Sequence, residues 1–134
     1  MAVSHWDAQL AREQIQIFLD RQLPSGGFCD VVWEKEGVVD GFGKPPVLPW
    51  ACMVMDRRNP DKAYLKRIYP KFAANAVFWQ RELGGNKDGL YHYGGKVPNF
   101  ESGWDDSVRW DNGCGNLWAI DLNCYLVMAY RSLA

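Results

Sequence analysis

Residues 45–56 read PPVLPWACMVMD and are apolar almost all round. The two leading prolines fit the start of a helix, where a missing N–H donor costs nothing. We therefore predict a helix from Pro45 to about Asp56. A helix without a polar face is buried on most sides, as an inner helix is in a two-layered arrangement of helices. The rest of the chain should pack around this segment.

Three further segments have helical patterns. A broad apolar stripe predicts a helix from Ala8 to Gln22, with Asp7 as its N-cap. A longer helix is predicted from Asp61 to Leu83, with a kink or split near Pro70, because proline cannot donate the helical hydrogen bond. The last helix is predicted over residues 118–131. The short turn between the helices at residues 45–56 and 61–83 indicates an antiparallel hairpin. The sequence predicts one all-α domain over residues 1–134.

The connecting segments are of two kinds. Residues 28–43 are irregular, and we expect a short β-hairpin in which Val31–Trp33 pairs with Val38 and Val39. Residues 84–117 form a long loop that begins with turn residues such as Asn86 and Gly89. This long loop holds the most unusual part of the sequence.

The centre of that loop, residues 101–111, reads ESGWDDSVRWD. No helical or strand period fits it. Two tryptophans and four carboxylates lie together here, although tryptophan is costly to expose and carboxylates are costly to bury. A concave polar surface with an aromatic wall can cover the tryptophan rings and keep the carboxylates solvated. Such a surface can bind a sugar, because the rings contact the apolar face of a pyranose and the charged groups contact its hydroxyls. The alternative is a solvated acidic loop whose tryptophans cap the core.

Composition excludes several classes of function. The chain has 134 residues and a net charge of -1, which gives no attraction for nucleic acid or anionic membranes. No run approaches the roughly 20 apolar residues that a membrane helix needs. The N-terminal residues lack the layout of a signal peptide, so we expect a cytoplasmic location. The four cysteines are widely spaced and only two histidines are present, so we expect no metal site, no cofactor and mostly buried thiols.

The loop resembles a known motif. Glu-Ser-Gly-Trp-Asp followed by Ser and Arg-Trp is similar to the catalytic-acid loop of inverting α-glycosidases built on an (α/α)6 barrel, namely glycoside hydrolase family 63 and the trehalases. Residues 44–51, KPPVLPWA, resemble the start of that family's Gln-Pro-Pro-x-x-x-Trp-Ala helix, with Lys44 in place of the usual Gln. Asp121-Leu122-Asn123 resembles its Asp-Leu-Asn. The resemblance runs from about Leu10 to the last residue.

The resemblance implies a fold and a role. An (α/α)6 barrel has twelve helices, so a chain of this length holds about a third of one. The expected fold is therefore a partial (α/α)6 toroid of about four helices in antiparallel hairpins, with a long site loop at residues 84–117. In the family, the Asp after Gly-Trp is the general acid, which falls here on Asp105. The family's general base is a Glu far downstream, in a part of the barrel that this chain is expected to lack.

The acid must hold its proton near neutral pH. The neighbouring tryptophans and the like charges of the loop could raise the pKa of Asp105 by desolvation and repulsion. Arg109 would lower that pKa if it paired with Asp105, so we assign Arg109 to Glu101, Asp111 or the substrate. Glu101 and Asp111 could equally fix the loop by hydrogen bonds to backbone N–H groups. The candidate substrate-binding residues are Glu101, Trp104, Arg109, Trp110, Asp111 and Lys44.

Two functions remain open from the sequence. The first is a glycosidase segment that binds an oligosaccharide or small glycoside and carries the general-acid loop. The second is a non-catalytic carbohydrate-binding or oligomeric helical domain. The partner of the chain would be the remainder of a barrel or further copies of itself, since an open third of a barrel exposes apolar surface. Nucleic acid and membranes are not expected partners.

Overall fold

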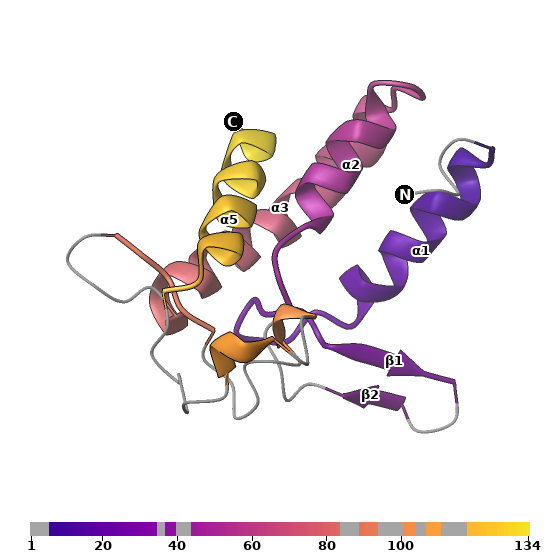
Figure 1. Ribbon diagram of the computed structural model, residues 1–134. Coiled ribbons are helices and arrows are strands. Elements are labelled where there is room, and N and C mark those ends of the chain that lie inside the picture. The colour runs from indigo at the N-terminus through magenta and orange to yellow at the C-terminus, as the bar shows by residue number, and fades with distance from the viewer. Residues whose placement is uncertain are drawn as a thin grey trace.

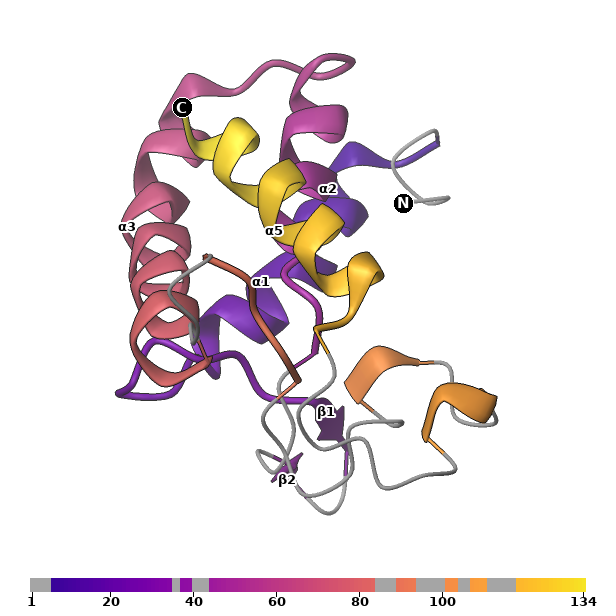
Figure 2. The ribbon, with the colours of Figure 1, turned by 60° about the vertical axis from the view of Figure 1, so that its left-hand side comes forward.

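The computed structural model describes residues 6–34, 37–39, 44–83, 89–93, 101–103, 107–110 and 118–134. This part of the chain contains four α-helices, namely α1 (Ala8–Asp20), α2 (Leu48–Asp56), α3 (Lys62–Phe78) and α5 (Ile120–Leu133). Successive helices run in opposite directions (Figure 1, Figure 2). The smaller elements are β1 (Val31–Trp33), β2 (Gly37–Val39), a π-helical turn η2 (Trp79–Leu83) and a 3-10 turn η3 (Val108–Trp110).

Two of the predicted helix starts are confirmed by their caps. The Oδ1 atom of Asp7 accepts a hydrogen bond of 2.9 Å from the backbone N–H of Leu10 at the start of α1. The Oδ1 atom of Asp61 accepts one of 2.9 Å from the N–H of Tyr64 at the start of α3. Each carboxylate thereby satisfies a backbone donor that has no partner within its helix.

The prolines behave differently from the prediction. Helix α2 begins at Leu48, three residues later than predicted, with Val47 as its N-cap residue. A helical backbone is disfavoured at Pro45, because another proline follows it. Instead, the carbonyl of Pro45 accepts a hydrogen bond of 2.8 Å from the N–H of Val47. Helix α3 continues through Pro70 and is not split there. Pro70 and Lys66, whose carbonyl loses its helical donor at Pro70, are both exposed residues.

The predicted β-hairpin is present. Strands β1 and β2 pair antiparallel, with Val31 opposite Val39, Val32 opposite Val38 and Trp33 opposite Gly37. Figure 1 and Figure 2 both place this hairpin at the end of the helices where α2 and α5 begin. The short segments on either side of residue 105 lie at the same end.

Buried apolar side chains form two clusters. The first, which we call the main core, joins α1, α2 and α3 and consists of Ala11, Ile15, Leu19, Cys52, Met55, Tyr64, Ile68 and Phe72. The second, which we call the site-end core, lies where α5 begins and consists of Trp79, Tyr93, Ala119, Leu122 and Leu126. The site-end core therefore unites the end of α3, the segment before the long loop and the first turns of α5.

A glycine turn ties α1 to α3. The carbonyl of Gly26 accepts hydrogen bonds from the side-chain amides of Gln22, at 2.9 Å, and Asn75, at 3.0 Å. Gly26 has a positive φ of 94°, and a Cβ atom at this position would lie 2.5 Å from the carbonyl oxygen of Ala74. Only glycine fits here without strain.

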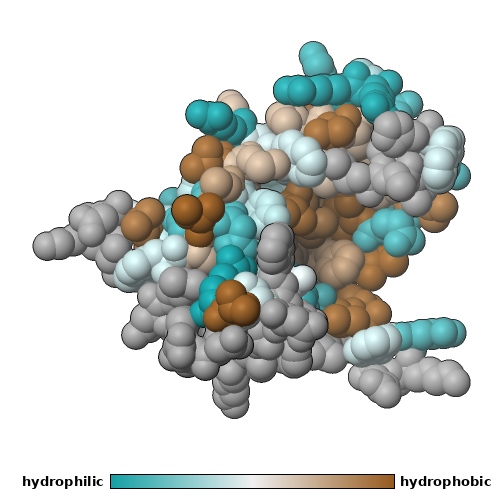
Figure 3. Space-filling model, in the orientation of Figure 1, coloured by the Kyte–Doolittle hydropathy of each residue, from teal (hydrophilic) through white to brown (hydrophobic). Residues whose placement is uncertain are grey.

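The all-α prediction is confirmed, and the arrangement is consistent with part of a helical toroid. The only paired strands among the described residues are the two of the short hairpin. Figure 3 shows apolar side chains gathered in a hollow on one face, between α5 and α1. Exposed apolar residues also occur on both helices, such as Ile17 on α1 and Val127 on α5. None of the described helices is long and apolar enough to span a membrane.

Candidate functional site

The first turn of α5 is the centre of the candidate site. Residues 91–93, which precede the long loop's centre, and turn η3, which follows residues 104–106, both reach this turn through side-chain contacts. Figure 2 shows the segments of the loop beside the start of α5. Two chain segments far apart in sequence are thus brought to one helix terminus.

Arg109 and Asp121 form a two-pronged ion pair. Nη1 of Arg109 donates to Oδ1 of Asp121 at 3.0 Å, and Nη2 donates to Oδ2 at 2.9 Å. A planar guanidinium that uses both prongs fixes the orientation of the carboxylate as well as its distance. Asp121 is a partner of Arg109 that the sequence analysis did not name. The pair fixes the position of η3 against α5.

Tyr93 adds a second donor to the same carboxylate. Its hydroxyl donates to Oδ2 of Asp121 at 3.2 Å. Burial raises the pKa of Asp121, but the hydrogen bonds and charge of Arg109, together with the Tyr93 hydroxyl, outweigh it and bring that pKa below its usual value. Burial, and next the charge of Asp121, raise the pKa of Tyr93 above its usual range. Asp121 is therefore ionised and Tyr93 neutral at physiological pH.

Asn123 fixes the segment before the loop. Its Oδ1 atom accepts a hydrogen bond of 3.0 Å from the N–H of Tyr91, and its Nδ2 atom donates to the carbonyl of Tyr91 at 3.0 Å. The Asn123 amide thus pairs with the Tyr91 backbone as a neighbouring strand would. The same Nδ2 atom also donates to the carbonyl of Ala119 at 2.9 Å. Nearby, the rings of His92 and Trp118 meet edge to face with centroids 5.3 Å apart.

Glu101, at the start of the loop's centre, is buried in the protein interior. Its exposed fraction is 0%, and the adjacent Ser102 is also buried. A carboxylate this deeply buried is costly unless protein groups compensate its charge. The burial of Glu101 does not fit a carboxylate of a solvated loop, and the choice between loop-fixing and sugar contact stays a prediction. The burial also means that Glu101 does not face solvent in this state.

Lys44 lies in the segment that leads into α2. Its Nζ atom is 3.1 Å from Oδ1 of Asp30, the residue before β1, and the Asp30 side chain is mostly buried. The ion pair ties the hairpin to the start of α2. Asp105, Trp104 and Asp111 lie outside the described residues. The backbone of Trp110 belongs to η3, but its side chain lies outside the described part.

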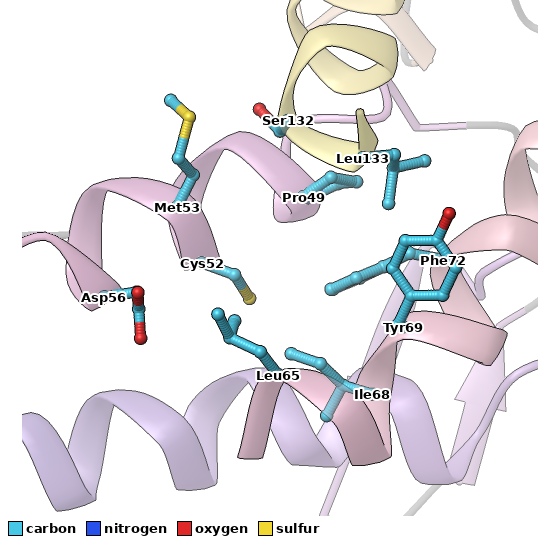
Figure 4. A pocket seen from close by; sticks show the side chains of 10 residues that line it. All are labelled: Pro49, Cys52, Met53, Asp56, Leu65, Ile68, Tyr69, Phe72, Ser132 and Leu133. Carbon is cyan, nitrogen blue, oxygen red and sulfur yellow. The ribbon is translucent and has the colours of Figure 1, made fainter. Parts of the chain in front are cut away.

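An apolar cavity of about 150 Å³ lies elsewhere, between α2, α3 and the last turn of α5 (Figure 4). Its walls are mainly aliphatic and aromatic, including Met53, Ile68 and Leu133. Burial, and next the charge of Asp56, raise the pKa of the Cys52 thiol in this wall to about 12. A protonated thiol is a poor nucleophile. This cavity lacks the convergent polar groups that a sugar site requires.

Sequence reasoning missed the roles of Asp121 and Tyr93. The signal for Asp121 was present, because Asp-Leu-Asn stood out in the sequence, but no pattern named its partner. Among the described residues, no group of three His, Cys, Asp or Glu side chains is arranged to hold a metal ion. The site as described is a polar junction of ionised and neutral oxygen groups with aromatic neighbours.

Comparison with known families identifies the family of the chain. Residues 1–123 match the model of the family described as the mannosylglycerate hydrolase MGH1-like glycoside hydrolase domain. No solved structure matches the chain significantly. The matched range contains every candidate site residue and extends to Asn123 in the first turn of α5. The chain belongs to the MGH1-like glycoside hydrolase domain family.

Proposed function

We propose that this chain carries the general-acid loop of an inverting α-glycosidase, with Asp105 as the residue that protonates the leaving oxygen. A carbohydrate substrate follows from membership of a glycoside hydrolase family. The observation that carries the proposal is the ion pair between Arg109 and Asp121, because it anchors the turn that follows Asp105 to a helix. A general acid must be held in place to act.

The same ion pair supports the required protonation state. A general acid needs a raised pKa, and a cation that paired with Asp105 would lower it. Both prongs of Arg109 contact Asp121, which compensates the guanidinium charge. The positive charge nearest in sequence after Asp105 is thereby neutralised by another carboxylate. This arrangement is compatible with the protonated Asp105 that we propose.

The remaining candidates divide into two groups. Trp104 and Trp110 offer ring faces to a pyranose, and Asp111 and Lys44 offer charged groups to its hydroxyls. Both Nη atoms of Arg109 donate to Asp121, so this ion pair limits the contacts that Arg109 can make with the substrate. Glu101 shapes the loop from beneath, in keeping with its burial. The site therefore combines an aromatic wall with a fixed polar floor.

Inversion also requires a general base on the opposite face of the sugar ring. Its carboxylate lies about 6.5–9.5 Å from the acid. The acid-loop carboxylates all come from one wall of the site, so we propose that the base comes from another part of a complete barrel. That part is either a further region of the barrel or another copy of this chain.

The first experiment replaces Asp105 by Asn and measures release of reducing sugar from α-linked gluco- and mannosides and trehalose. The matched control is Asp106→Asn, which removes a carboxylate from the next position of the same loop. We expect Asp105→Asn to lower kcat by at least about 100-fold and Asp106→Asn to lower it far less. An unchanged rate in Asp105→Asn would remove Asp105 from the acid role.

Two further measurements complete the test. Product analysis by NMR during turnover should show the anomer of inverted configuration first. Titration with the same sugars should change tryptophan fluorescence. A fluorescence change without any sugar release would favour the non-catalytic carbohydrate-binding alternative, since binding needs only the aromatic and polar wall.

A further inference from the structure

We propose that Asp121 is a positioning residue that holds the acid loop on both sides of Asp105. It binds Arg109, which follows Asp105 in the sequence, and Tyr93, which precedes it. The inference rests on the proposed function, because it names the residue that places the general acid. Asp121 itself acts only through the segments that it holds.

The geometry makes Asp121 a junction of three chain segments. Its two oxygens accept three hydrogen bonds, of 3.0 and 2.9 Å from Arg109 and 3.2 Å from Tyr93. Charge-assisted hydrogen bonds of this kind are roughly twice as strong as neutral ones. The two-pronged contact fixes rotation as well as distance. One carboxylate therefore ties Tyr93 and Arg109, which lie on either side of residue 105 in the sequence, to the first turn of α5.

The carboxylate is itself held rigidly. Asp121 lies in the first turn of α5, where the helix dipole favours a negative charge. Its neighbours Ala119 and Leu122 are buried in the site-end core. Asn123, one residue further on, clamps the backbone of Tyr91. Because the first turn of α5 is fixed in this way, the ion pair of Asp121 with Arg109 also fixes the position of the loop.

The rate of the reaction depends on how closely Asp105 is held at the distance that proton transfer requires. A displacement of about 1 Å in a catalytic group costs on the order of 100-fold in rate. Without the Asp121 carboxylate, Arg109 loses both of these contacts and Tyr93 loses its acceptor. The loop then samples several positions of Asp105, and the rings of Trp104 and Trp110 on the same loop lose their fixed positions with it. The loss should therefore appear in kcat and also in KM.

The test compares Asp121→Asn with Asp61→Asn. Asp61 is a matched control, because it also lies at a helix start and faces an arginine, with Nη1 of Arg12 3.6 Å from its Oδ2 atom. We expect Asp121→Asn to lower kcat by roughly 10- to 100-fold and to raise KM as well, because catalytic and sugar-binding residues lie on the same loop. Asp61→Asn should leave both values nearly unchanged. Thermal melts of both variants exclude simple unfolding as the cause.

A double-variant cycle tests whether Asp121 acts through Arg109. The combination of Arg109→Gln with Asp121→Asn should lower kcat no more than the worse single substitution does, because both remove the same contact. Additive losses would overturn the proposal. Asp105→Asn is measured in parallel. If Asp105→Asn is inactive while Asp121→Asn retains full kcat, this inference fails and the proposed function stands.

Hydrogen exchange supplies a readout that does not depend on turnover. Amides of residues 101–110 should exchange at least about tenfold faster in Asp121→Asn than in Asp61→Asn, while the amides of α2 and α3 exchange equally in both. Equal exchange over residues 101–110 in the two variants would overturn the inference even in a chain that shows no hydrolysis by itself. If Asp105→Asn keeps the wild-type rate, the proposed function fails separately.

Discussion

The main core and the junction at α5 are held together by different physics. The main core joins three helices through apolar side chains that recur with the helical period. The junction joins two loop segments to one helix turn through Asp121 and Asn123, whose partners follow no period. The apolar packing of the main core tolerates small shifts and stabilises the bundle of helices. The contacts of the junction are directional and make a loop specific in position.

The largest effect should come from emptying the main core. Phe72 is 3% exposed, and its ring meets that of Phe28 edge to face at 6.0 Å. Phe72→Ala should lower the free energy of unfolding by roughly 3–5 kcal/mol, as measured by urea denaturation. Val77→Ala is the control on the same helix, with a side chain that is 53% exposed. A similar loss in both variants would mean that α3 is not packed on α1 and α2 as described.

The glycine turn should give the next largest effect. Gly26→Ala places a methyl group against the carbonyl of Ala74 in a backbone conformation that favours glycine, so we expect a loss of about 2–4 kcal/mol. Gly89 also has a positive φ, of 75°, but has open space around it. Gly89→Ala should therefore cost only about 1 kcal/mol. Equal urea midpoints for the two variants would contradict a close approach of α1 to α3.

The ion pair of the junction should contribute less to stability, and its contribution should depend on pH. Asp121→Asn should lower the free energy of unfolding by about 1–2 kcal/mol at pH 7. The pKa of Asp121 is lowered by folding, so its contribution is present above the usual carboxyl pKa of about 4 and is lost as pH falls through the folded value.

Urea titrations at neutral pH and at successively lower pH values check this dependence. The difference in stability between the wild type and Asp121→Asn should be constant above about pH 5 and shrink in more acidic solution. A difference that does not change with pH would show that the charge of Asp121 is not what holds the junction.

The smallest effect should come from Tyr93. Tyr93→Phe removes only the hydroxyl that donates to Asp121 and leaves the buried ring in the site-end core. We expect a loss of about 0.5–1 kcal/mol in urea denaturation. In the Asp121→Asn background the same substitution should cost less, because the charged acceptor is already gone. An undiminished cost would assign the effect to packing of the ring.

Much of the helical body could be predicted from the sequence. Apolar periodicity and the cap residues Asp7 and Asp61 are local signals, and they predicted the helices and two of their starts correctly. The predicted start of α2 is three residues too early. At Pro45, the proline that follows disfavours a helical backbone. The error is one of local backbone sterics rather than of fold.

The site could be predicted only in part. The sequence indicated which loop carries the chemistry, and the glycoside hydrolase resemblance is confirmed by the family match over residues 1–123. The roles of Asp105, Trp104 and Asp111 stay predictions. The sequence analysis assigned Arg109 to Glu101, Asp111 or the substrate and did not name Asp121 on α5, with which Arg109 forms an ion pair. A contact between separate elements leaves no periodic signal in one sequence.

The bonds between α1 and α3 have a consequence for how the chain folds during synthesis. The contacts from Gln22 to Lys71 and from Asn75 to Gly26 each join residues 49 positions apart, and closing such a loop costs about 3.5 kcal/mol in chain entropy. At about 5–20 residues per second, α1 waits several seconds for α3 to leave the ribosome. During that wait its apolar stripe lacks the side chains of α3 that complete the main core. A nascent chain stalled before Lys71 should therefore be cleaved by protease within α1, and one that includes α3 should resist, which makes the emergence of α3 the moment at which aggregation stops competing with folding.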